Sequence, residues 1–162
     1  MYPCLELAGF AAAQAVCCLF DRQPMLPLAF SRRGAGTPAV KILPATTPEA
    51  IAAEGRRWFA ANVEEADEAV IVADAFVTIA AVKKDALLLD LRSYRNPAGQ
   101  MRMAVPYRPH HHPDGFAVYR PKFIVAAIEG QDAASMTGAF FRGVSSHLPG
   151  WRVWNACADE SW

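Results

Sequence analysis

The side chains best suited to bind a metal ion lie in one loop, 109–115, which contains three consecutive histidines. Neutral imidazoles bind Zn²⁺, Ni²⁺ and Cu²⁺, and the carboxylate of Asp114 could add an oxygen ligand. Successive residues of an extended segment point to opposite sides, so only His110 and His112 can converge on one ion. The prolines and the Asp-Gly pair of the loop are typical of turns. We therefore expect an exposed loop without a resident metal, with His110, His112 and Asp114 as its only metal-binding candidates.

A hydroxyl beside an imidazole, the pair needed for nucleophilic catalysis, occurs only in Ser145-Ser146-His147. Side chains adjacent in sequence rarely point at the same atom, and the chain has no G-x-S-x-G motif to present an activated serine. It also lacks the glycine-rich phosphate-binding motifs of nucleotide-dependent proteins. The sequence predicts no catalytic residue and no cofactor. An enzyme of another type, using the histidine loop, stays open as an alternative.

Basic and aromatic side chains that could bind an anion recur between residues 92 and 122. Some alternate with the apolar residues along two expected strands, so they face the other side of the sheet. Two others flank Pro121. Such a surface can bind a carboxylate or a partner protein, but the solvent-facing side or a guarded edge of an antiparallel sheet has the same composition. The candidate ligand-binding residues are Arg92, Tyr94, Arg102, Arg108, Arg120 and Lys122.

The charge balance limits the classes of partner. Sixteen basic and sixteen acidic residues give a net charge of zero, and 53% hydrophobic with 20% charged residues is a globular composition. A neutral protein has no long-range attraction for phosphate backbones, so we expect no nucleic-acid partner. Weak self-repulsion makes self-association more plausible. The four cysteines have no metal-finger or C-x-x-C spacing, and reduced cysteines indicate a cytoplasmic protein.

An apolar segment near the N-terminus, 10–20, resembles a signal peptide or membrane anchor in composition. No Lys or Arg precedes it, whereas Glu6 does, so the basic region of a signal peptide is missing. The segment ends at Asp21-Arg22, which makes it too short to cross a bilayer. We expect a buried helix here and no membrane partner.

A helix over about 48–62 has a clear start signal. Thr47 can cap its first turn, and Pro48 suits the first helical position because the proline has no amide hydrogen to satisfy there. Gly55 in the middle is about 1 kcal/mol less favourable than alanine, which suggests that a neighbouring backbone approaches closely.

The chain between residues 25 and 125 has the alternation and punctuation of β-strands. The links between the later strands are too short to hold crossover helices, so neighbouring strands must be antiparallel. Together with the helices, the pattern predicts one α+β domain over residues 1–162, with an antiparallel meander covered by helices on one face, in the order α-β-β-α-β-β-β-β-α. The expected strands are 25–30, 39–43, 69–79, 86–91, 101–105 and 116–125.

The pairing of strands 86–91 and 101–105 is limited by their apolar residues. Leu87, Leu89 and Leu91 alternate with other residues, as do Met101, Met103 and Val105. Both sets share a face only if the numbers of paired residues add to an even sum, which requires a loop with an odd number of residues. The simplest loop is 96–100, which pairs Leu91 with Val105.

The C-terminal part combines a helix signal with an unusual tail. Asp132 can cap a helix that ends near His147, before Pro149-Gly150. Trp151 and Trp154 should be buried, because exposing two indoles forfeits about 2–3 kcal/mol each. In an extended tail their side chains would point to opposite sides, and one indole would need cover from a second copy of the chain.

These observations favour a protein-interaction or assembly module that forms a homodimer, with Trp151 and Trp154 at its interface. A domain that binds a small anionic ligand is the alternative, and an enzyme that uses the histidine loop is another.

Overall fold

The computed structural model describes residues 1–162 except 63, 80, 97–98, 127–131 and 162. The described part forms four helices and eight strands, in which five strands follow the second helix and two helices follow those strands. Their bounds are α1 Tyr2–Phe20, β1 Leu28–Arg32, β2 Ala39–Ile42, α2 Pro48–Ala61, β3 Glu68–Ile79, β4 Val82–Ser93, β5 Gln100–Arg108, β6 Ala117–Tyr119, β7 Lys122–Ala126, α3 Ala133–Ser146, α4 Leu148–Cys157 and β8 Ala158–Asp159.

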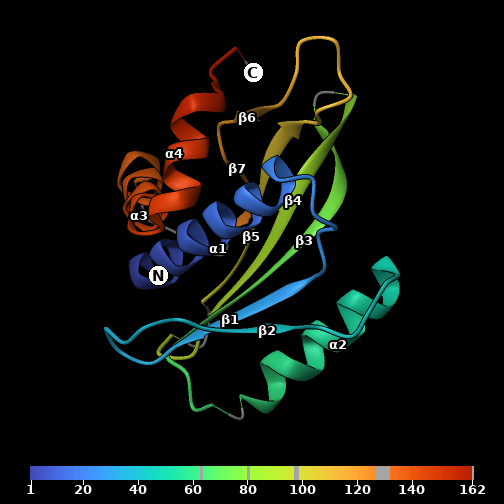
Figure 1. Ribbon diagram of the computed structural model, residues 1–162. Coiled ribbons are helices and arrows are strands. Elements are labelled where there is room, and N and C mark those ends of the chain that lie inside the picture. The colour runs from blue at the N-terminus through green and yellow to red at the C-terminus, as the bar shows by residue number, and fades with distance from the viewer. Residues whose placement is uncertain (63, 80, 97–98, 127–131, 162) are drawn as a thin grey trace.

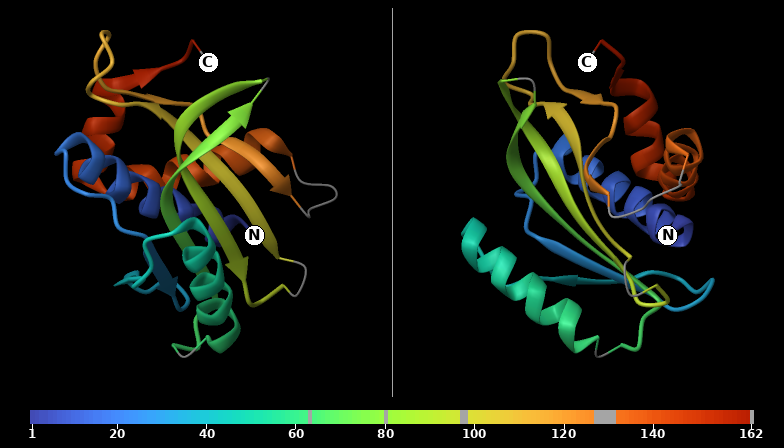
Figure 2. Two further views of the ribbon diagram at one scale, coloured as in Figure 1. Left: turned by 90° about the vertical axis from the view of Figure 1, so that its right-hand side faces the viewer. Right: turned by 180° about the vertical axis from the view of Figure 1, so that it is seen from behind.

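The strands form one mostly antiparallel sheet between two unequal helical layers. Its order is β2-β1-β3-β4-β5-β6-β8, and β7 also pairs with β5. α1, α3 and α4 lie on one side of the sheet and α2 lies on the other (Figures 1 and 2). The predicted α+β fold with an antiparallel sheet and packed helices is confirmed. The expected single helical face holds for three helices, whereas α2 buries Trp58 and Phe59 against the opposite face.

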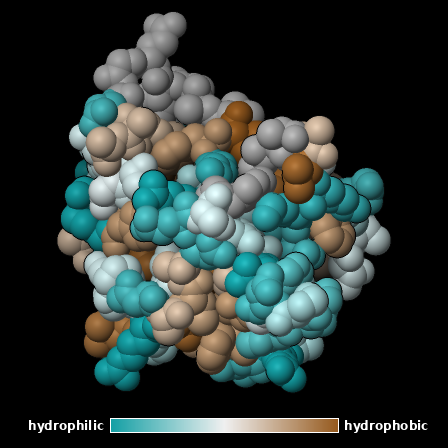
Figure 3. Space-filling model, turned by 90° about the horizontal axis from the view of Figure 1, so that it is seen from above, coloured by the Kyte–Doolittle hydropathy of each residue, from teal (hydrophilic) through white to brown (hydrophobic). Residues whose placement is uncertain are grey.

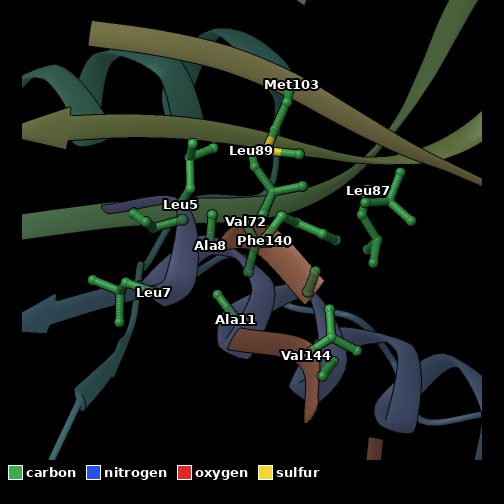
Figure 4. Close-up of a cluster of buried hydrophobic side chains, with 14 of the residues drawn as sticks. Leu5, Leu7, Ala8, Ala11, Val72, Leu87, Leu89, Met103, Phe140 and Val144 are labelled. Atoms are coloured by element: carbon green, nitrogen blue, oxygen red, sulfur yellow. The ribbon is translucent and has the colours of Figure 1, made fainter. Parts of the chain in front are cut away.

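α1 is the central core helix, and it begins at Tyr2, before the apolar segment 10–20 from which it was predicted. Leu5, Ala8 and Ala11 face Val72 of β3 and Phe140 of α3 (Figure 4). With 19 residues and a mean hydropathy of 1.6, α1 is long and apolar enough to cross a membrane, so the argument from insufficient length was wrong. In this fold 56% of that apolar window is buried within the chain, as expected for a core helix.

Glycines let α1, α3 and α4 approach to backbone contact. A Cβ added to Gly9 of α1 would lie 1.9 Å from the carbonyl oxygen of Phe140, and one added to Gly143 of α3 would lie 1.8 Å from that of Glu6. Gly150 of α4 has the same relation to α1, with the carbonyl oxygen of Ala13 at 2.2 Å. Any side chain would push these helices apart, since real Cβ atoms do not approach so closely.

The β4–β5 hairpin confirms the parity of the prediction and corrects its register. Leu91 pairs with Met101 rather than Val105, so paired numbers add to 192 instead of 196. The Ser93 amide donates to the Gly99 carbonyl at 2.8 Å, which leaves an odd number of residues, 94–98, between them. The apolar sets still share the core face, because the sum remains even.

The last predicted strand, 116–125, is two strands separated by Arg120-Pro121. β6 pairs with the end of β5, at Tyr107 and Arg108, whereas β7 pairs with its beginning, from Met101 to Ala104. Proline cannot donate a ladder hydrogen bond, so the break falls where Pro121 stands.

α2 follows its predicted signals. The Thr47 hydroxyl accepts a hydrogen bond from the Ala50 amide at 3.2 Å, and Asn62 closes the helix with a left-handed φ of 37°. Gly55 does allow a close approach, but of a side chain and not of a backbone: an added Cβ would lie 2.8 Å from Cδ1 of Ile71.

The tryptophan tail is helical, which corrects the extended alternative. α3 begins at its predicted cap, where the Asp132 carboxylate accepts a hydrogen bond from the Ser135 amide. Pro149 lies in the first turn of α4 and does not end the helical region. Trp154 is only 4% exposed and contacts Phe140 and Phe141, while Trp151 is partly buried against the same core. The chain itself therefore covers the indole of Trp154 and part of that of Trp151.

Candidate functional site

The histidine loop brings together two of its three candidate ligands, since His112 Nδ1 lies 3.6 Å from a carboxylate oxygen of Asp114, whereas His110 contacts α1. His110 Nε2 lies 2.9 Å from the Phe20 carbonyl oxygen, and its ring stacks on Phe116 at 4.9 Å between centroids. His112 turns back on the loop, where its Nδ1 accepts from the Asp114 amide at 3.2 Å. Across the described residues, no three His, Cys, Asp or Glu side chains are grouped so that they could hold a metal ion. Through these two contacts, His110 links the end of α1 to the residue that precedes β6.

The serines before His147 are also engaged locally. The hydroxyls of Ser145 and Ser146 donate to the carbonyls of Arg142 and Gly143, one helical turn earlier. His147 Nδ1 accepts from the Gly150 amide at 3.0 Å and caps α4, and its Nε2 lies 2.9 Å from Gln14 Oε1. These bonds give the imidazole a structural role at the junction of α1, α3 and α4.

Three of the six anion-binding candidates are held by carboxylates. Arg102 donates to both oxygens of Asp90, at 2.6 and 2.8 Å, and this hydrogen bonding raises the pKa of Arg102 further. Arg108 pairs with Asp159 of β8 at 3.2 Å, and Arg120 pairs with Glu160 at 2.8 Å. Arg108 also donates to the carbonyl oxygens of Asp114 and Gly115.

The other three candidates lie in two places. The Arg92 guanidinium lies 5.4 Å from the Tyr94 ring, and the Tyr94 hydroxyl donates to the Phe59 carbonyl of α2 at 2.8 Å. Burial raises the pKa of Tyr94. Lys122 lines a groove at the start of β7. The six side chains therefore do not converge on one anion, because their strands carry them to different ends of the sheet.

Acidic residues of the 64–68 segment contact the β1–β2 hairpin. Glu68 is 3% exposed and pairs with Arg32 at 3.4 Å, while burial raises its pKa. Hydrogen bonds from Arg95 and from the Gly34 amide lower the pKa of Asp67 to about 2. The Ser31 hydroxyl and the Glu64 carboxylate form a hydrogen bond beside a cavity of about 10 Å³, the size of one water molecule. These contacts stabilise the hairpin.

Strand β2 is an open edge of the sheet. All four of its residues are exposed, including Val40 at 59% and Ile42 at 56%. Ile42 and Val40 stand opposite Leu28 and Phe30 in β1, and the Leu43 amide donates to the Pro27 carbonyl. Ladder alternation then directs the backbone groups of Lys41 toward β1 and those of Val40 and Ile42 away from the sheet.

A second surface feature is a groove of about 630 Å³ between the end of β3 and the start of β7. Seen from above, hydrophilic and hydrophobic areas lie side by side on the surface (Figure 3). Neither surface was predicted as a site, although Lys122, which lines the groove, was a candidate ligand-binding residue. The alternation of Val40, Lys41 and Ile42 was the one feature of the sequence that could have indicated the open edge. The groove could not be recognised in this way, because its residues are far apart in sequence. The residues that line the groove are Val77, Thr78, Pro121, Lys122, Phe123 and Ile124.

Comparison with protein-family models, with curated protein sequences and with solved structures found no match to this chain.

Proposed function

We propose that this protein is an interaction module that assembles as a homodimer, and that the β2 edge is its contact surface. The observation that carries the proposal is an edge strand on which Val40 and Ile42 are more than half exposed while their backbone groups point away from the sheet. Unpaired backbone donors and acceptors on an apolar edge bind another strand by extending the sheet. Four free cysteines support a reducing, cytoplasmic setting as part of this proposal.

A second copy of the chain is the simplest partner for this edge. Two β2 strands related by a two-fold axis run antiparallel, so each supplies the donors and acceptors that the other needs. Val40 and Ile42 of both copies would then lie on one face and cover each other. The zero net charge of the chain gives little long-range repulsion between copies.

Lys41 restricts the register of such a dimer. Its side chain points to the sheet face opposite to Val40 and Ile42, because neighbouring residues of a strand alternate. A two-fold axis through Lys41 would place two ammonium groups directly opposite each other, which is destabilising. We therefore place the axis at Val40 or at Ile42.

The proposed interface differs from the tryptophan tail favoured by the sequence. Trp154 belongs to the core of the monomer, and Trp151 is partly covered by the same chain. The need for external cover arose only for an extended tail, and α4 is a helix.

Light scattering of Val40→Lys tests the proposal. We expect the unaltered chain to show about twice its monomer mass of 17.6 kDa at micromolar concentration, and Val40→Lys to be monomeric. Val82→Lys is the matched control, since Val82 is also an exposed valine in a strand, at 47%, but lies at the far hairpin tip. A monomeric unaltered chain, or equal masses for the two variants, would contradict the proposal.

A further inference from the structure

Two turns bound the part of the β2 edge that can pair with another strand. Before β2, the Gly36 amide donates to the carbonyl oxygen three residues earlier at 3.1 Å and closes the hairpin turn. After β2, the Ala45 amide donates to the Leu43 carbonyl at 2.9 Å, and the chain turns towards α2. The segment between these turns, 37–43, contains β2 and is centred on Val40.

The outward-facing backbone groups of this segment come from alternate residues. The amides of Val40 and Ile42 are outward donors, because the Leu43 amide bonds to the Pro27 carbonyl on the inner side. The alternation continues to Pro38, whose fixed φ is compatible with an extended chain, so its carbonyl also faces outward. Proline has no amide hydrogen, and Pro38 can therefore only accept a hydrogen bond.

A two-fold axis at Val40 gives each outward amide an acceptor. Val40 then stands opposite Val40 of the second copy, and each amide donates to the other carbonyl. Ile42 stands opposite Pro38 of the second copy, so the Ile42 amide donates to the Pro38 carbonyl. On the other side of the sheet, Lys41 stands opposite Ala39, an exposed small residue that leaves the ammonium group in water.

An axis at Ile42 is less favourable for two reasons. The Val40 amide would need the carbonyl of Pro44, which lies at the turn after β2. Lys41 would stand opposite Leu43 of the second copy, which is 2% exposed and packs against the aromatic side chains of α2. Moving an ammonium group towards this apolar cluster removes water from a charge without supplying a partner, which is unfavourable.

We propose that the two-fold axis of the homodimer passes through Val40, and that Pro38 of each copy accepts a hydrogen bond from the Ile42 amide of the other. This inference rests on the proposed assembly through β2 and specifies which residues of the second copy complete the edge. Both outward amides of each copy are then bonded, so the dimer leaves neither of them to recruit a third strand.

Disulfide cross-linking with diamide as the oxidant, read on a non-reducing gel, tests the register. Two Val40→Cys chains should cross-link, because directly opposed residues have Cα atoms about 5.5 Å apart, within the range that a disulfide bridges. Two Ile42→Cys chains should not cross-link, since their substituted residues would lie roughly 13 Å apart along the strands. An equimolar mixture of Ile42→Cys and Pro38→Cys should form a cross-link between the two variants, because these positions are opposite each other.

Two controls set the background of this experiment. The unaltered chain measures cross-linking through the four native cysteines, three of which are partly exposed. Val82→Cys measures random collision, since Val82 is exposed at the far hairpin tip. We expect Val40→Cys to cross-link at least about tenfold faster than Val82→Cys, because thiols held opposite each other have an effective concentration far above micromolar.

The outcomes separate the register from the assembly. If Ile42→Cys cross-links with itself faster than Val40→Cys does, while light scattering still shows a dimer, the register is overturned and the assembly through β2 stands. If Val40→Cys and the mixture are no faster than Val82→Cys, the register is also overturned. The mass of the unaltered chain then distinguishes a dimer with another interface from a monomer.

Discussion

At the scale of single residues, His147 shows how a potential catalytic group is committed to structure. Its Nδ1 accepts a hydrogen bond from the Gly150 amide, and its Nε2 faces the side-chain oxygen Oε1 of Gln14. The neutral imidazole with a proton on Nε2 satisfies both contacts. The rings of Phe10 and His147 pack edge to face, with their centroids 5.1 Å apart. Protonation of Nδ1 would remove the acceptor that caps α4.

His147 should make stability depend on pH. Burial lowers its pKa below the usual 6.5, so the unfolded chain binds the proton more readily than the folded chain. The stability that the neutral ring supplies is complete above pH 6.5 and is lost as the pH falls from 6.5 through the folded-state pKa. We expect the urea midpoint to fall from pH 7.5 to 5.5 in the unaltered chain and to fall less in His147→Asn, which keeps a capping acceptor but does not titrate. Equal pH dependence in both proteins would contradict this role.

Arginines on the sheet are likewise committed to structure, through ion pairs within the chain. Their spacing predicted an anion-binding surface, but Arg102 and Arg108 meet carboxylates of this chain at 2.6 and 3.2 Å. Asp90 stands opposite Arg102 in the ladder, a pairing that the sequence alone could not give before the register was known. Asp159 reaches Arg108 from the other end of the chain, 51 residues away in sequence.

At the scale of elements, the packing of α1 against α3 depends on residues without side chains. Gly143→Ala should destabilise the protein by at least about 2 kcal/mol, because the new methyl would overlap the Glu6 carbonyl and separate two core helices. Gly138→Ala in the same helix is the control: its Cβ would meet only an Arg142 nitrogen, at 3.8 Å.

The control substitution should be neutral or stabilising by up to about 1 kcal/mol, since alanine favours helix over glycine. Urea unfolding of the two variants measures the contrast. If Gly143→Ala and Gly138→Ala have the same stability, the close helix crossing is wrong.

Helix ends were predictable from sequence where a single local signal decided them. Thr47-Pro48 and Asp132 mark the starts of α2 and α3 because a capping side chain acts within one turn. Pro149 shows the limit of such signals. Proline after a helix suggests its end, yet proline also suits a first helical turn, and here it lies in the first turn of α4.

Strand pairing was predictable only in part. The parity of the β4–β5 pair follows from the two-residue period of side chains, so it held. The register depended on where the strands end, and Arg92 and Ser93 continue β4 beyond its apolar run. Neither candidate surface could be predicted, because the open edge and the groove depend on which strands become neighbours.

At the scale of the whole molecule, the fold leaves one edge of the sheet, strand β2, open. β1 is paired on both sides, by β2 and β3, whereas β2 has a partner on one side only among the described residues. α1 covers the core face at Phe30, where Phe10 packs edge to face on its ring, but Val40 beside it remains 59% exposed. Assembly through β2 would pair this edge and cover Val40 and Ile42 without changing the fold of the monomer.

Hydrogen exchange of the Val40 and Ile42 amides, measured over a range of protein concentrations, tests the proposed assembly most directly. In the homodimer these outward-facing amides bond to the second copy, so their exchange should slow as the concentration rises through the dissociation constant. The Lys41 amide, directed toward Ala29 in β1, is the internal reference and should be protected at every concentration. Fast exchange of Val40 and Ile42 at all concentrations, with Lys41 protected, would contradict assembly through this edge.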